Sequence, residues 1–256
     1  MQKRFVWEEK MFDFSGKVVI VTGGASGIGL CTARHMVSLG ASVAVFDRQE
    51  ALEDSREPDK PVFFRTDVTQ EDEVERNVSL VAEKWGRIDA LVCSAGVTYP
   101  YKTVVESDLA GWERTVNINS RGVFFCNRAV FPIMEKQRSG SIVNIASVAA
   151  KTGGGLLGNA IYGASKAAVM SFSKGMAREG GPLGITVNVI CPGVVDTPMS
   201  QGLTQESRKS LLAATPLGKF ADPVDIMNTI VFLCSDSARH ITSVCLNVDG
   251  GFMHGN

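Results

Sequence analysis

The sequence predicts an α/β fold: one doubly wound domain in which helices cover both faces of a seven-stranded parallel sheet. Short apolar runs rich in β-branched residues alternate with helical patterns along the chain. These runs read as buried on both faces, which is typical of strands in a parallel sheet between two helical layers. No repeat, low-complexity tract or linker divides the 256 residues. We therefore expect residues 1–15 to form an N-terminal arm and residues 16–256 to form a single domain.

The expected elements follow one another in regular alternation. Strands are predicted at Lys17–Thr22, Ala41–Phe46, Val62–Arg65, Ile88–Cys93, Ser141–Ala146, Thr186–Ile190 and Val244–Val248. Helices are predicted at Ile28–Leu39, Glu71–Trp85, Ile161–Glu179 and Val224–Ser235, with a weak helix or loop at Arg48–Lys60 and one long helix or a helix pair at Leu109–Lys136. Ligands of such sheets bind beyond the carboxyl ends of the strands, so the residues directly after each strand are the candidates for function.

Charge and cysteine usage exclude several classes of protein. The chain has 26 Lys and Arg against 27 Asp and Glu, so it lacks the basic footprint of a nucleic-acid-binding protein. No apolar run is long enough to span a membrane, and charges interrupt the N-terminal segment where a signal peptide would need an apolar core. The six cysteines form no Cys-x-x-Cys pair, which favours free thiols over a metal site or a disulfide scaffold. We expect a cytoplasmic protein whose partner is a small molecule.

Glycine is the one unusual component, at 26 residues. A glycine-rich turn, Thr22–Gly29, lies between the first strand and the first helix. Glycine permits a tight turn and a close approach of phosphate to the main chain, and the helix N-terminus offers free N–H groups to that phosphate. The position between strand and helix favours a dinucleotide site over a plain turn. The expected contacts are Gly23, Ser26, Gly27, Ile28 and Gly29.

Asp47 ends the second strand, where an acid can accept hydrogen bonds from the ribose hydroxyls and repel a 2′-phosphate. Arg48 follows it and keeps NADP as an alternative. Ser26 stands in the turn where a basic residue would meet that phosphate. The pattern therefore favours NAD over NADP. Two further turns reach the same edge of the sheet and suit an adenine contact and a close main-chain approach, although each alone is no better than an ordinary turn: Asp67-Val68 and Ser94-Ala95-Gly96.

Tyr162 and Lys166 lie one turn apart on a predicted helix and so face the same way. A phenol titrates near pH 10, and a neighbouring ammonium is expected to lower that pKa, as would a bound oxidised nicotinamide. Tyr162 is then a candidate general base for an alcohol, or general acid for a carbonyl. Ser147, directly after the fifth strand, can donate a hydrogen bond to the reacting oxygen. Taken alone, the Tyr–Lys pair fits an ordinary surface pair equally well.

Together these motifs resemble the short-chain dehydrogenase/reductase family, over nearly all of Gly16–Gly251. The matching features are TGGASGIG, Tyr162-x-x-x-Lys166, Ser147, Asn119 in VNINSRGVFF, Pro192-Gly193-Val194-Val195-Asp196-Thr197, and the C-terminal pattern from Leu217. Asn117 competes for the position of Asn119, but the spacing to Phe124 favours Asn119.

The resemblance implies a Rossmann-type fold and a role for each matching residue. Tyr162 would exchange a proton with the substrate oxygen, and Ser147 would orient the substrate. Lys166 would bind the nicotinamide ribose and lower the pKa of the tyrosine, and Asn119 would hold a water that links Lys166 to solvent. The nicotinamide amide would be held by the loop that contains Pro192, Gly193, Val195 and Thr197. Relatives with an acid at position 47 usually prefer NAD. Pairing of the long helices Leu109–Lys136 and Ile161–Glu179 across subunits would give a homodimer or homotetramer.

The chain departs from the family pattern in three places. Cys93-Ser94 stands where the family commonly has two asparagines, which puts the contacts of those amides in doubt. Residues 148–161 separate Ser147 from Tyr162 by slightly more than is usual, and the extra length falls in glycine-rich Lys151–Gly158. The arm at residues 1–15 extends beyond the usual start, where it would cover a sheet edge or a subunit contact.

The sequence therefore predicts an NAD-dependent oxidoreductase that interconverts a secondary alcohol and a ketone. The expected substrate loops are Val97–Val105, Ser147–Ala160 and a lid at Met199–Phe220 with helical Glu206–Ala214. Hydroxyls and cations in these loops (Tyr99, Tyr101, Lys102, Arg208 and Lys209) suit a sugar, polyol or hydroxy acid, although a merely solvated lid is as plausible. Leu156-Leu157 leaves room for a bulkier apolar substrate. The alternatives are an NADPH-dependent 3-oxoacyl or other carbonyl reductase and a nucleotide-binding regulator without catalysis.

Overall fold

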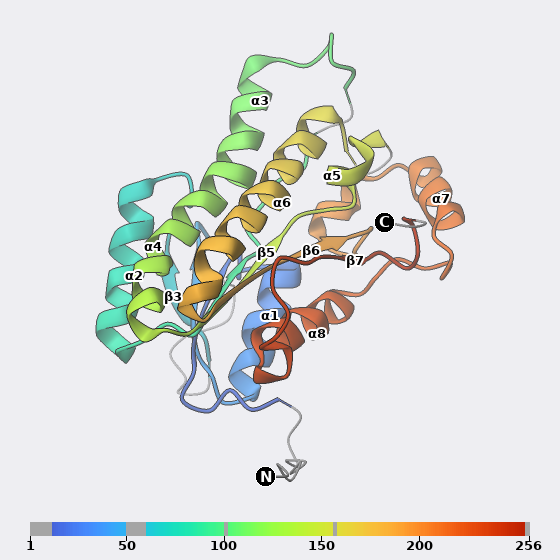
Figure 1. The fold of residues 1–256 in the computed structure, drawn as a ribbon. Helices are drawn as coiled ribbons and strands as arrows, with labels where there is room; N and C mark the ends of the chain where they lie inside the picture. The colour runs from blue at the N-terminus through green and yellow to red at the C-terminus, as the bar shows by residue number, and fades with distance from the viewer. Residues whose placement is uncertain (1–11, 50–59, 100–101, 156–157, 254–256) are drawn as a thin grey trace.

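The computed structural model describes residues 12–49, 60–99, 102–155 and 158–253. Its sheet has seven parallel strands in the order β3-β2-β1-β4-β5-β6-β7 (Figure 1). The predicted fold class is confirmed, and each strand lies close to its predicted bounds: β1 Val18–Thr22, β2 Ser42–Asp47, β3 Val62–Arg65, β4 Ala90–Cys93, β5 Gly140–Ile145, β6 Ile185–Pro192 and β7 Cys245–Val248. The order reverses between β1 and β4, which is where a sheet of this topology binds its ligand.

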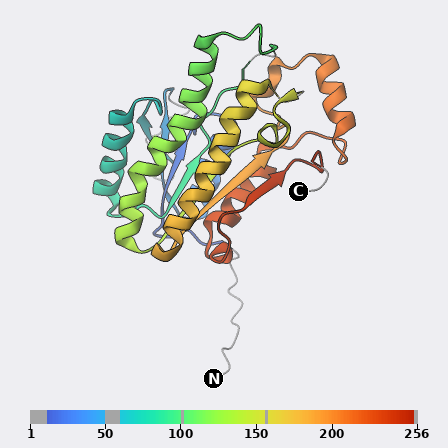
Figure 2. The same ribbon diagram turned by 45° about the horizontal axis from the view of Figure 1, so that its top comes forward.

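Helices cover both faces of the sheet (Figure 2). One layer contains α1 (Gly27–Ser38) and α8 (Pro223–Cys234), and the other contains α2 (Glu71–Trp85), α4 (Gly122–Gln137) and α6 (Ala160–Gly180). Successive strand residues point to opposite faces, so Ile20 packs into one apolar core and Val21 into the other. Both cores are fully buried, which explains why the strands are apolar on both sides.

The long helical stretch expected at Leu109–Lys136 is neither one regular helix nor a separated pair. It runs as α3 (Leu109–Val116), a π-helical turn η1 (Asn117–Arg121) and α4 without a break in the chain. Asp108 caps α3 by accepting a hydrogen bond from the Gly111 N–H. Periodicity does not predict the π turn, which wraps an extra residue into the helix. Such turns are often found at functional sites, and this one contains Asn119.

The described end of the N-terminal arm packs beneath the sheet. Phe14 is buried, and its N–H donates a hydrogen bond of 3.0 Å to the carbonyl oxygen of Leu39, just after α1. This part of the arm therefore contacts the end of α1 and joins the apolar core on that face of the sheet. Residues 1–11 of the arm and residues 50–59 of the predicted weak helix lie outside the described residues.

Short helices surround the carboxyl edge of the sheet. They are α5 (Ala149–Thr152) after β5, the 3-10 turn η4 (Pro198–Gly202) after β6, and α7 (Gln205–Ala214), which confirms the helix expected in the lid. Two further 3-10 turns, η3 (Gly181–Leu183) and η5 (Asp236–Ala238), lie elsewhere in the chain. Within the described residues, no helix combines the length and the apolar character needed to cross a membrane.

Candidate active site at the carboxyl edge of the sheet

The strand register aligns the ends of the central strands. Thr22 at the end of β1 pairs with Cys93 of β4, Cys93 pairs with Asn144 of β5, and Ile145 pairs with Ile190 of β6. The segments that follow these strands therefore meet at one edge. They include the glycine-rich turn, Ser94–Gly96, Ser147 and the loop Pro192–Thr197, as the sequence predicts.

Tyr162 lies in the first turn of α6, is 8% exposed, and has Ser147 near enough to affect the pKa of its phenol. Ser147 is itself held in place, because its Oγ accepts a hydrogen bond of 3.1 Å from the Ala149 N–H at the start of α5. Burial raises the pKa of Tyr162, and the Ser147 hydroxyl lowers it to a lesser extent. The sequence analysis expects Lys166 to lower this pKa, and for the protein without its cofactor that expectation is wrong. The loss of water around the phenol has the larger effect and raises the pKa.

Lys166 lies one turn further along α6 and is 5% exposed. Its Nζ donates a hydrogen bond of 2.9 Å to the carbonyl oxygen of Ile145 at the end of β5. Burial lowers the pKa of Lys166 to about 8, against a smaller opposing effect of the Cys93 and Cys191 thiols. An ammonium with this pKa remains mostly charged at neutral pH and can donate to an acceptor on the same edge of the sheet.

Asn119 is completely buried and joins three segments of the site. Its Nδ2 donates to the Val97 carbonyl at 2.9 Å and to the Ser165 Oγ at 3.0 Å, and its Oδ1 accepts from the Val97 N–H at 2.8 Å. A side chain at Gly96 would come within 3.3 Å of both the Asn119 Oδ1 and the Lys166 Nζ. Asn119 therefore reaches the same small space as Lys166, whereas its competitor Asn117 is only half-buried.

The glycine-rich turn fits a pyrophosphate. Gly23 has φ +68°, and a Cβ there would lie 2.7 Å from the Cα of Ala95, while a Cβ at Gly29 would collide with the Gly23 carbonyl oxygen. Both positions require glycine. Ser26 is the N-cap of α1 but makes no side-chain cap, and the first turn contains no acid. The N–H groups of this turn, including those of Gly27 and Ile28, therefore face no capping side chain, as anion binding requires.

Asp47 is positioned by the same turn. Its Oδ2 accepts a hydrogen bond of 3.0 Å from the Ala25 N–H, and its Oδ1 accepts one of 3.1 Å from the Gln49 N–H. The carboxylate therefore lies against the glycine-rich turn, where a ribose beside the pyrophosphate would meet it. Arg48 forms an ion pair of 3.6 Å with Asp67. Its guanidinium is thus directed to the end of β3.

The two turns expected to contact adenosine also reach this edge. Asp67 accepts hydrogen bonds from the N–H and Oγ1 of Thr69. Val68 is buried, and a side chain at Gly122 would collide with it, so Val68 packs closely against the start of α4. The Ala95 N–H donates a hydrogen bond of 3.1 Å to the Oγ1 of Thr22, which ties Ser94–Gly96 to the end of β1.

The loop after β6 returns to the glycine-rich turn. The Gly193 N–H donates to the Val248 carbonyl, and Val195 forms an isolated parallel bridge with Ala221. Thr197 caps η4 together with Ser200, and a Cβ at Gly27 would lie 3.3 Å from the Cγ2 of Thr197. The loop Pro192–Thr197 is thereby fixed beside the N-terminus of α1.

Cys93 stands where the family commonly has an asparagine, and amides of neighbouring side chains form the hydrogen bonds around it. The Cys93 thiol accepts a hydrogen bond of 3.4 Å from the Nδ2 of Asn127 on α4. Asn127 and Asn144 exchange two hydrogen bonds of 3.0 Å, and Asn144 also donates to the Ser173 Oγ on α6 at 2.9 Å. The loss of one amide at position 93 leaves a polar network that ties β4 and β5 to α4 and α6.

Two of the cations in the expected substrate loops, Lys102 and Arg208, are paired within the protein. Lys102 forms an ion pair of 3.4 Å with Asp108. Arg208 of α7 lies 3.5 Å from the Asp196 carboxylate and 4.7 Å from the ring centre of Phe220. These contacts fasten the loops themselves. The expectation that Lys102 and Arg208 are cations directed at a substrate is not supported. Tyr101 and Leu156-Leu157 lie outside the described residues.

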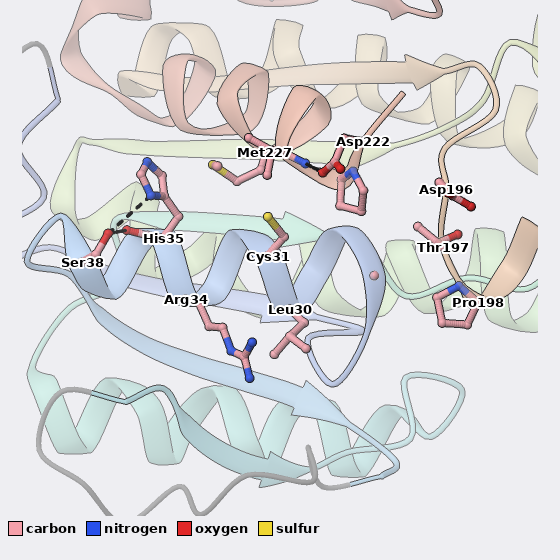
Figure 3. A pocket seen from close by; sticks show the side chains of 13 residues that line it. Leu30, Cys31, Arg34, His35, Ser38, Asp196, Thr197, Pro198, Asp222 and Met227 are labelled. Carbon is pink, nitrogen blue, oxygen red and sulfur yellow. Dashed lines mark hydrogen bonds between the residues drawn. The ribbon is translucent and has the colours of Figure 1, made fainter. Parts of the chain in front are cut away.

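A separate cavity of about 690 Å³ lies between α1 and α8 (Figure 3). Cys31 and His35 of α1 face Asp222 and Met227 across it. Gly27 and Thr197 line the end beside the glycine-rich turn. Ser147, Tyr162 and Lys166 do not line this cavity. This cavity is therefore distinct from the space around the candidate catalytic residues.

Three groups at the site are not predicted from the sequence. The Ile145 carbonyl and the Ser165 hydroxyl hold Lys166 and Asn119, and only the tertiary structure brings them there. The third is Asn159, whose Oδ1 caps α6 by accepting from the Tyr162 N–H. Its signal in the sequence is an asparagine three residues before a helical Tyr, which is a typical N-cap position.

Comparison with known proteins identifies the class of protein. A family sequence model described as enoyl-(acyl carrier protein) reductase matches residues 23–253. The chain is 37% identical over 247 residues to the 3-oxoacyl-[acyl-carrier-protein] reductase FabG of Thermotoga maritima, covering 93% of this chain and 98% of the relative. It is 35% identical over 244 residues to cis-4-hydroxycyclohexanecarboxylate dehydrogenase of Sinomonas cyclohexanicum, covering 93% of this chain and 97% of the relative.

The ligand-free structure of an aldohexose dehydrogenase of Thermoplasma acidophilum superposes with a TM-score of 0.84 at 29% identity, covering 94% of this chain and 96% of that chain. The fold and the site thus define a nicotinamide-dependent oxidoreductase that acts on CH–OH groups. The chain belongs to the short-chain dehydrogenase/reductase family.

Proposed function

We propose that the chain interconverts a secondary alcohol and a ketone with NAD, on a sugar, polyol or hydroxy acid. The observation that carries this proposal is the buried set of Ser147, Tyr162 and Lys166. The Ser147 hydroxyl acts on the phenol of Tyr162 and lowers its pKa, and Lys166 is fixed one helical turn away by the Ile145 carbonyl. A phenol, a hydroxyl and an ammonium at one edge of the sheet can together hold a substrate oxygen and exchange its proton.

In this mechanism Tyr162 takes the proton of the alcohol oxygen, or gives one to the ketone oxygen. Ser147 donates a hydrogen bond to the same oxygen as negative charge develops on it. Burial raises the pKa of Tyr162, so an added positive charge is needed to favour the phenolate. When bound, the nicotinamide supplies the hydride acceptor or donor and, in its oxidised form, that charge. Lys166 holds the nicotinamide ribose, and Asn119 holds a water that links Lys166 to solvent.

The cofactor contacts follow the same edge. We propose that the pyrophosphate lies on the main chain of Gly23 and of Ser26–Gly29, and that the adenosine contacts Asp67-Val68 and Ser94–Gly96. Pro192, Gly193, Val195 and Thr197 hold the nicotinamide amide. Asp47 selects NAD, because its carboxylate lies against the glycine-rich turn and would repel a 2′-phosphate. The ion pair of Arg48 with Asp67 supports this choice, since it engages the arginine that follows Asp47 in the chain.

An NADPH-dependent 3-oxoacyl reductase is the second candidate. The 37% identity to the Thermotoga maritima enzyme favours it. Asp47 and Ser26 oppose it, because the turn then offers a 2′-phosphate a carboxylate and no cation. A nucleotide-binding regulator without catalysis gains no support, because it would not need the assembled Ser147, Tyr162 and Lys166.

The test is a panel of sugars, polyols, hydroxy acids and steroids, offered with NAD⁺ or NADP⁺ and followed by the absorbance of the reduced nicotinamide. A 3-oxoacyl thioester with NADPH or NADH is the opposing arm. We expect turnover of alcohols with NAD⁺. Turnover confined to the thioester with NADPH would favour the second candidate.

We further propose a homodimer or homotetramer that pairs the α4 and α6 surfaces. Phe124 of α4 is 38% exposed and packs edge-on against Phe172 of α6, with ring centres 5.9 Å apart. An apolar surface that continues across two helices is typical of a subunit contact. Light scattering on the wild type and on Phe124→Glu tests this: a stable wild-type monomer at micromolar concentration contradicts it.

We also propose that residues 16–256 form one domain and that the protein is cytoplasmic. The match of the family model to residues 23–253 supports one domain over residues 16–256. The six free cysteines support a reducing, cytoplasmic setting.

A further inference from the structure

The cavity between α1 and α8 has apolar walls and no part in the proposed chemistry. Its volume of about 690 Å³ falls within the range of ligand pockets, which is about 300–1,000 Å³. Cys31 of α1 and Met227 of α8 face each other across it (Figure 3). Val224, at the start of α8, also lines it and is 44% exposed. The cavity thus offers an apolar surface that a further group could cover.

Asp222 gives this cavity a negative charge. Its Oδ1 accepts a hydrogen bond of 2.9 Å from the Val224 N–H, and among the described residues no ion pair involves its carboxylate. Burial raises the pKa of the Cys31 thiol, and the charge of Asp222 raises it further, so the carboxylate and the thiol lie close together. An occupant that combines apolar side chains with a cation would complement this cavity.

The described part of the N-terminal arm begins at one end of the same cavity. Phe14 is buried in the apolar cluster that also contains Met227, and its N–H donates to the Leu39 carbonyl oxygen at 3.0 Å. Ser38, which precedes Leu39, lines the cavity. Gly27 and Thr197 line the opposite end. The chain that precedes Phe14 therefore starts beside the Ser38 end.

Residues 1–11, which lie outside the described residues, have the length and composition to fill the cavity. They read MQKRFVWEEKM, with three consecutive apolar residues at positions 5–7 directly after a basic pair. The 12 residues of α1 span about 18 Å, a length that about five or six residues of extended chain also cover. Trp7 is five residues before Phe12, so residues 5–7 reach the part of the cavity that contains Cys31 and Asp222.

We propose that residues 4–7 of the arm dock in the cavity between α1 and α8 of their own chain. The rings of Phe5 and Trp7 then pack on Val224 and Met227, and Arg4 pairs with Asp222. A segment tethered this close has an effective concentration of the order of millimolar, which favours it over the arm of a second copy at micromolar concentration. The inference does not depend on the proposed function.

The first test uses Trp7 as a fluorescent reporter. The chain has three tryptophans, so Trp85→Phe combined with Trp112→Phe leaves Trp7 alone in the full-length protein. We expect acrylamide to quench it about threefold less, or weaker still, in the folded protein than in urea, because a packed ring presents less surface. Quenching as strong as in urea would overturn the inference.

One further substitution in this background locates the docking. Val224→Glu should remove most of the protection of Trp7, because it places a charge in the apolar wall, while an acid in the first turn of α8 remains compatible with the helix. Val105→Glu is the matched control, because Val105 is 95% exposed and does not line the cavity. Equal protection of Trp7 in the two variants would overturn the inference.

A cross-link identifies the occupant. Glu8→Cys places a thiol next to Trp7, and Cys31 supplies the second thiol inside the cavity. A short bis-maleimide should join them, as mass spectrometry of the peptides can show, and Cys31→Ser should abolish the product. In a mixture of isotopically labelled and unlabelled protein, we expect each linked pair to carry one isotope only. Isotopically mixed pairs would show that a second copy fills the cavity, and they would overturn the inference, as would a link to another cysteine or no link.

Discussion

The ammonium nitrogen of Lys166 lies 2.9 Å from the carbonyl oxygen of Ile145. The same stretch of chain presents Ser147 two residues later, so the end of β5 positions both a lysine and a serine of the proposed site. An ammonium has three donors, and this bond uses one, which leaves two for a ligand. Lys166 is thus held in place by the main chain of the protein itself.

Replacing Lys166 should change how stability depends on pH. Its pKa falls from 10.5 to about 8 on burial, a difference equivalent to about 3 kcal/mol. Between pH 8 and 10.5 the unfolded chain holds a proton on Lys166 that the folded chain has lost. Stability from this group therefore rises with pH across that window and is lowest below it.

Urea unfolding of the wild type and of Lys166→Met, below pH 8 and above pH 10.5, measures the effect. The wild type should gain about 3 kcal/mol relative to the variant across the window. The buried thiols titrate in both proteins and cancel in this difference. A difference that stays constant with pH would mean that Lys166 is not desolvated as described.

Tyr162→Phe should lower kcat by about a thousandfold or more, because it removes the proton donor and acceptor. NADH binding, measured by fluorescence, should stay near the wild-type value. Tyr99→Phe is the matched control: Tyr99 is buried in the same apolar cluster, but its hydroxyl faces Asp108 at 3.4 Å. Retained turnover in Tyr162→Phe, or an equal loss in the control, would contradict the proposed role.

Asp47→Ala should weaken the use of NAD⁺ and admit NADP⁺, shifting the ratio of their kcat/KM values by about tenfold or more. The cause is the removal of a carboxylate that repels a 2′-phosphate. Asp47→Asn separates charge from geometry, because it keeps an oxygen for the Ala25 N–H. If neither variant alters the preference, Asp47 does not face the ribose.

Gly29→Ala should abolish NADH binding or folding, because the new methyl group would collide with the Gly23 carbonyl oxygen. Gly175→Ala is the opposite case. Gly175 lies within α6, and a methyl group added there would meet no neighbouring atom within 4 Å, so alanine should stabilise the helix by about 1 kcal/mol. Thermal unfolding and NADH titration of both variants measure the contrast, and similar behaviour of the two would refute it.

Cys191 and Cys234 should resist alkylation. Burial raises the pKa of Cys191 to about 11 and that of Cys234 to about 12, so almost no thiolate is present near neutral pH. Iodoacetamide should modify these two residues only after unfolding in urea, as peptide mass spectrometry can show. Rapid labelling of the folded protein at either residue would indicate that the core opens readily.

The sheet is predictable because each strand is a short apolar run bounded by glycine or charge. The predicted strand Val62–Arg65 has the same bounds as β3, and the other predicted strands differ from the observed ones only at their ends. The glycine-rich turn and the Tyr162–Lys166 spacing are local patterns, and the strand order brings them to one edge. These features can be inferred from the sequence because nearby residues determine them.

Features that depend on tertiary contacts could not be inferred. The direction of the pKa shift of Tyr162 follows from burial, which the spacing to Lys166 does not report. Arg208 is engaged by Asp196 and Phe220, which come from two other segments. Among the described residues, the Nδ2 of Asn159 has no hydrogen-bond partner, and only the placement of its neighbours in space reveals this.

Because of the π-helical turn at Asn117–Arg121, the number of residues between α3 and α4 cannot change without moving one of these helices. Removing one residue would let α3 and α4 merge into a regular helix but would rotate one against the other by about 100°. Either Asn119 would leave Val97, or the buried face of α4 with Cys126 and Val130 would leave the core. Exposed positions such as Arg121 can vary in identity. Insertions and deletions here should instead be as damaging as the loss of Asn119 itself.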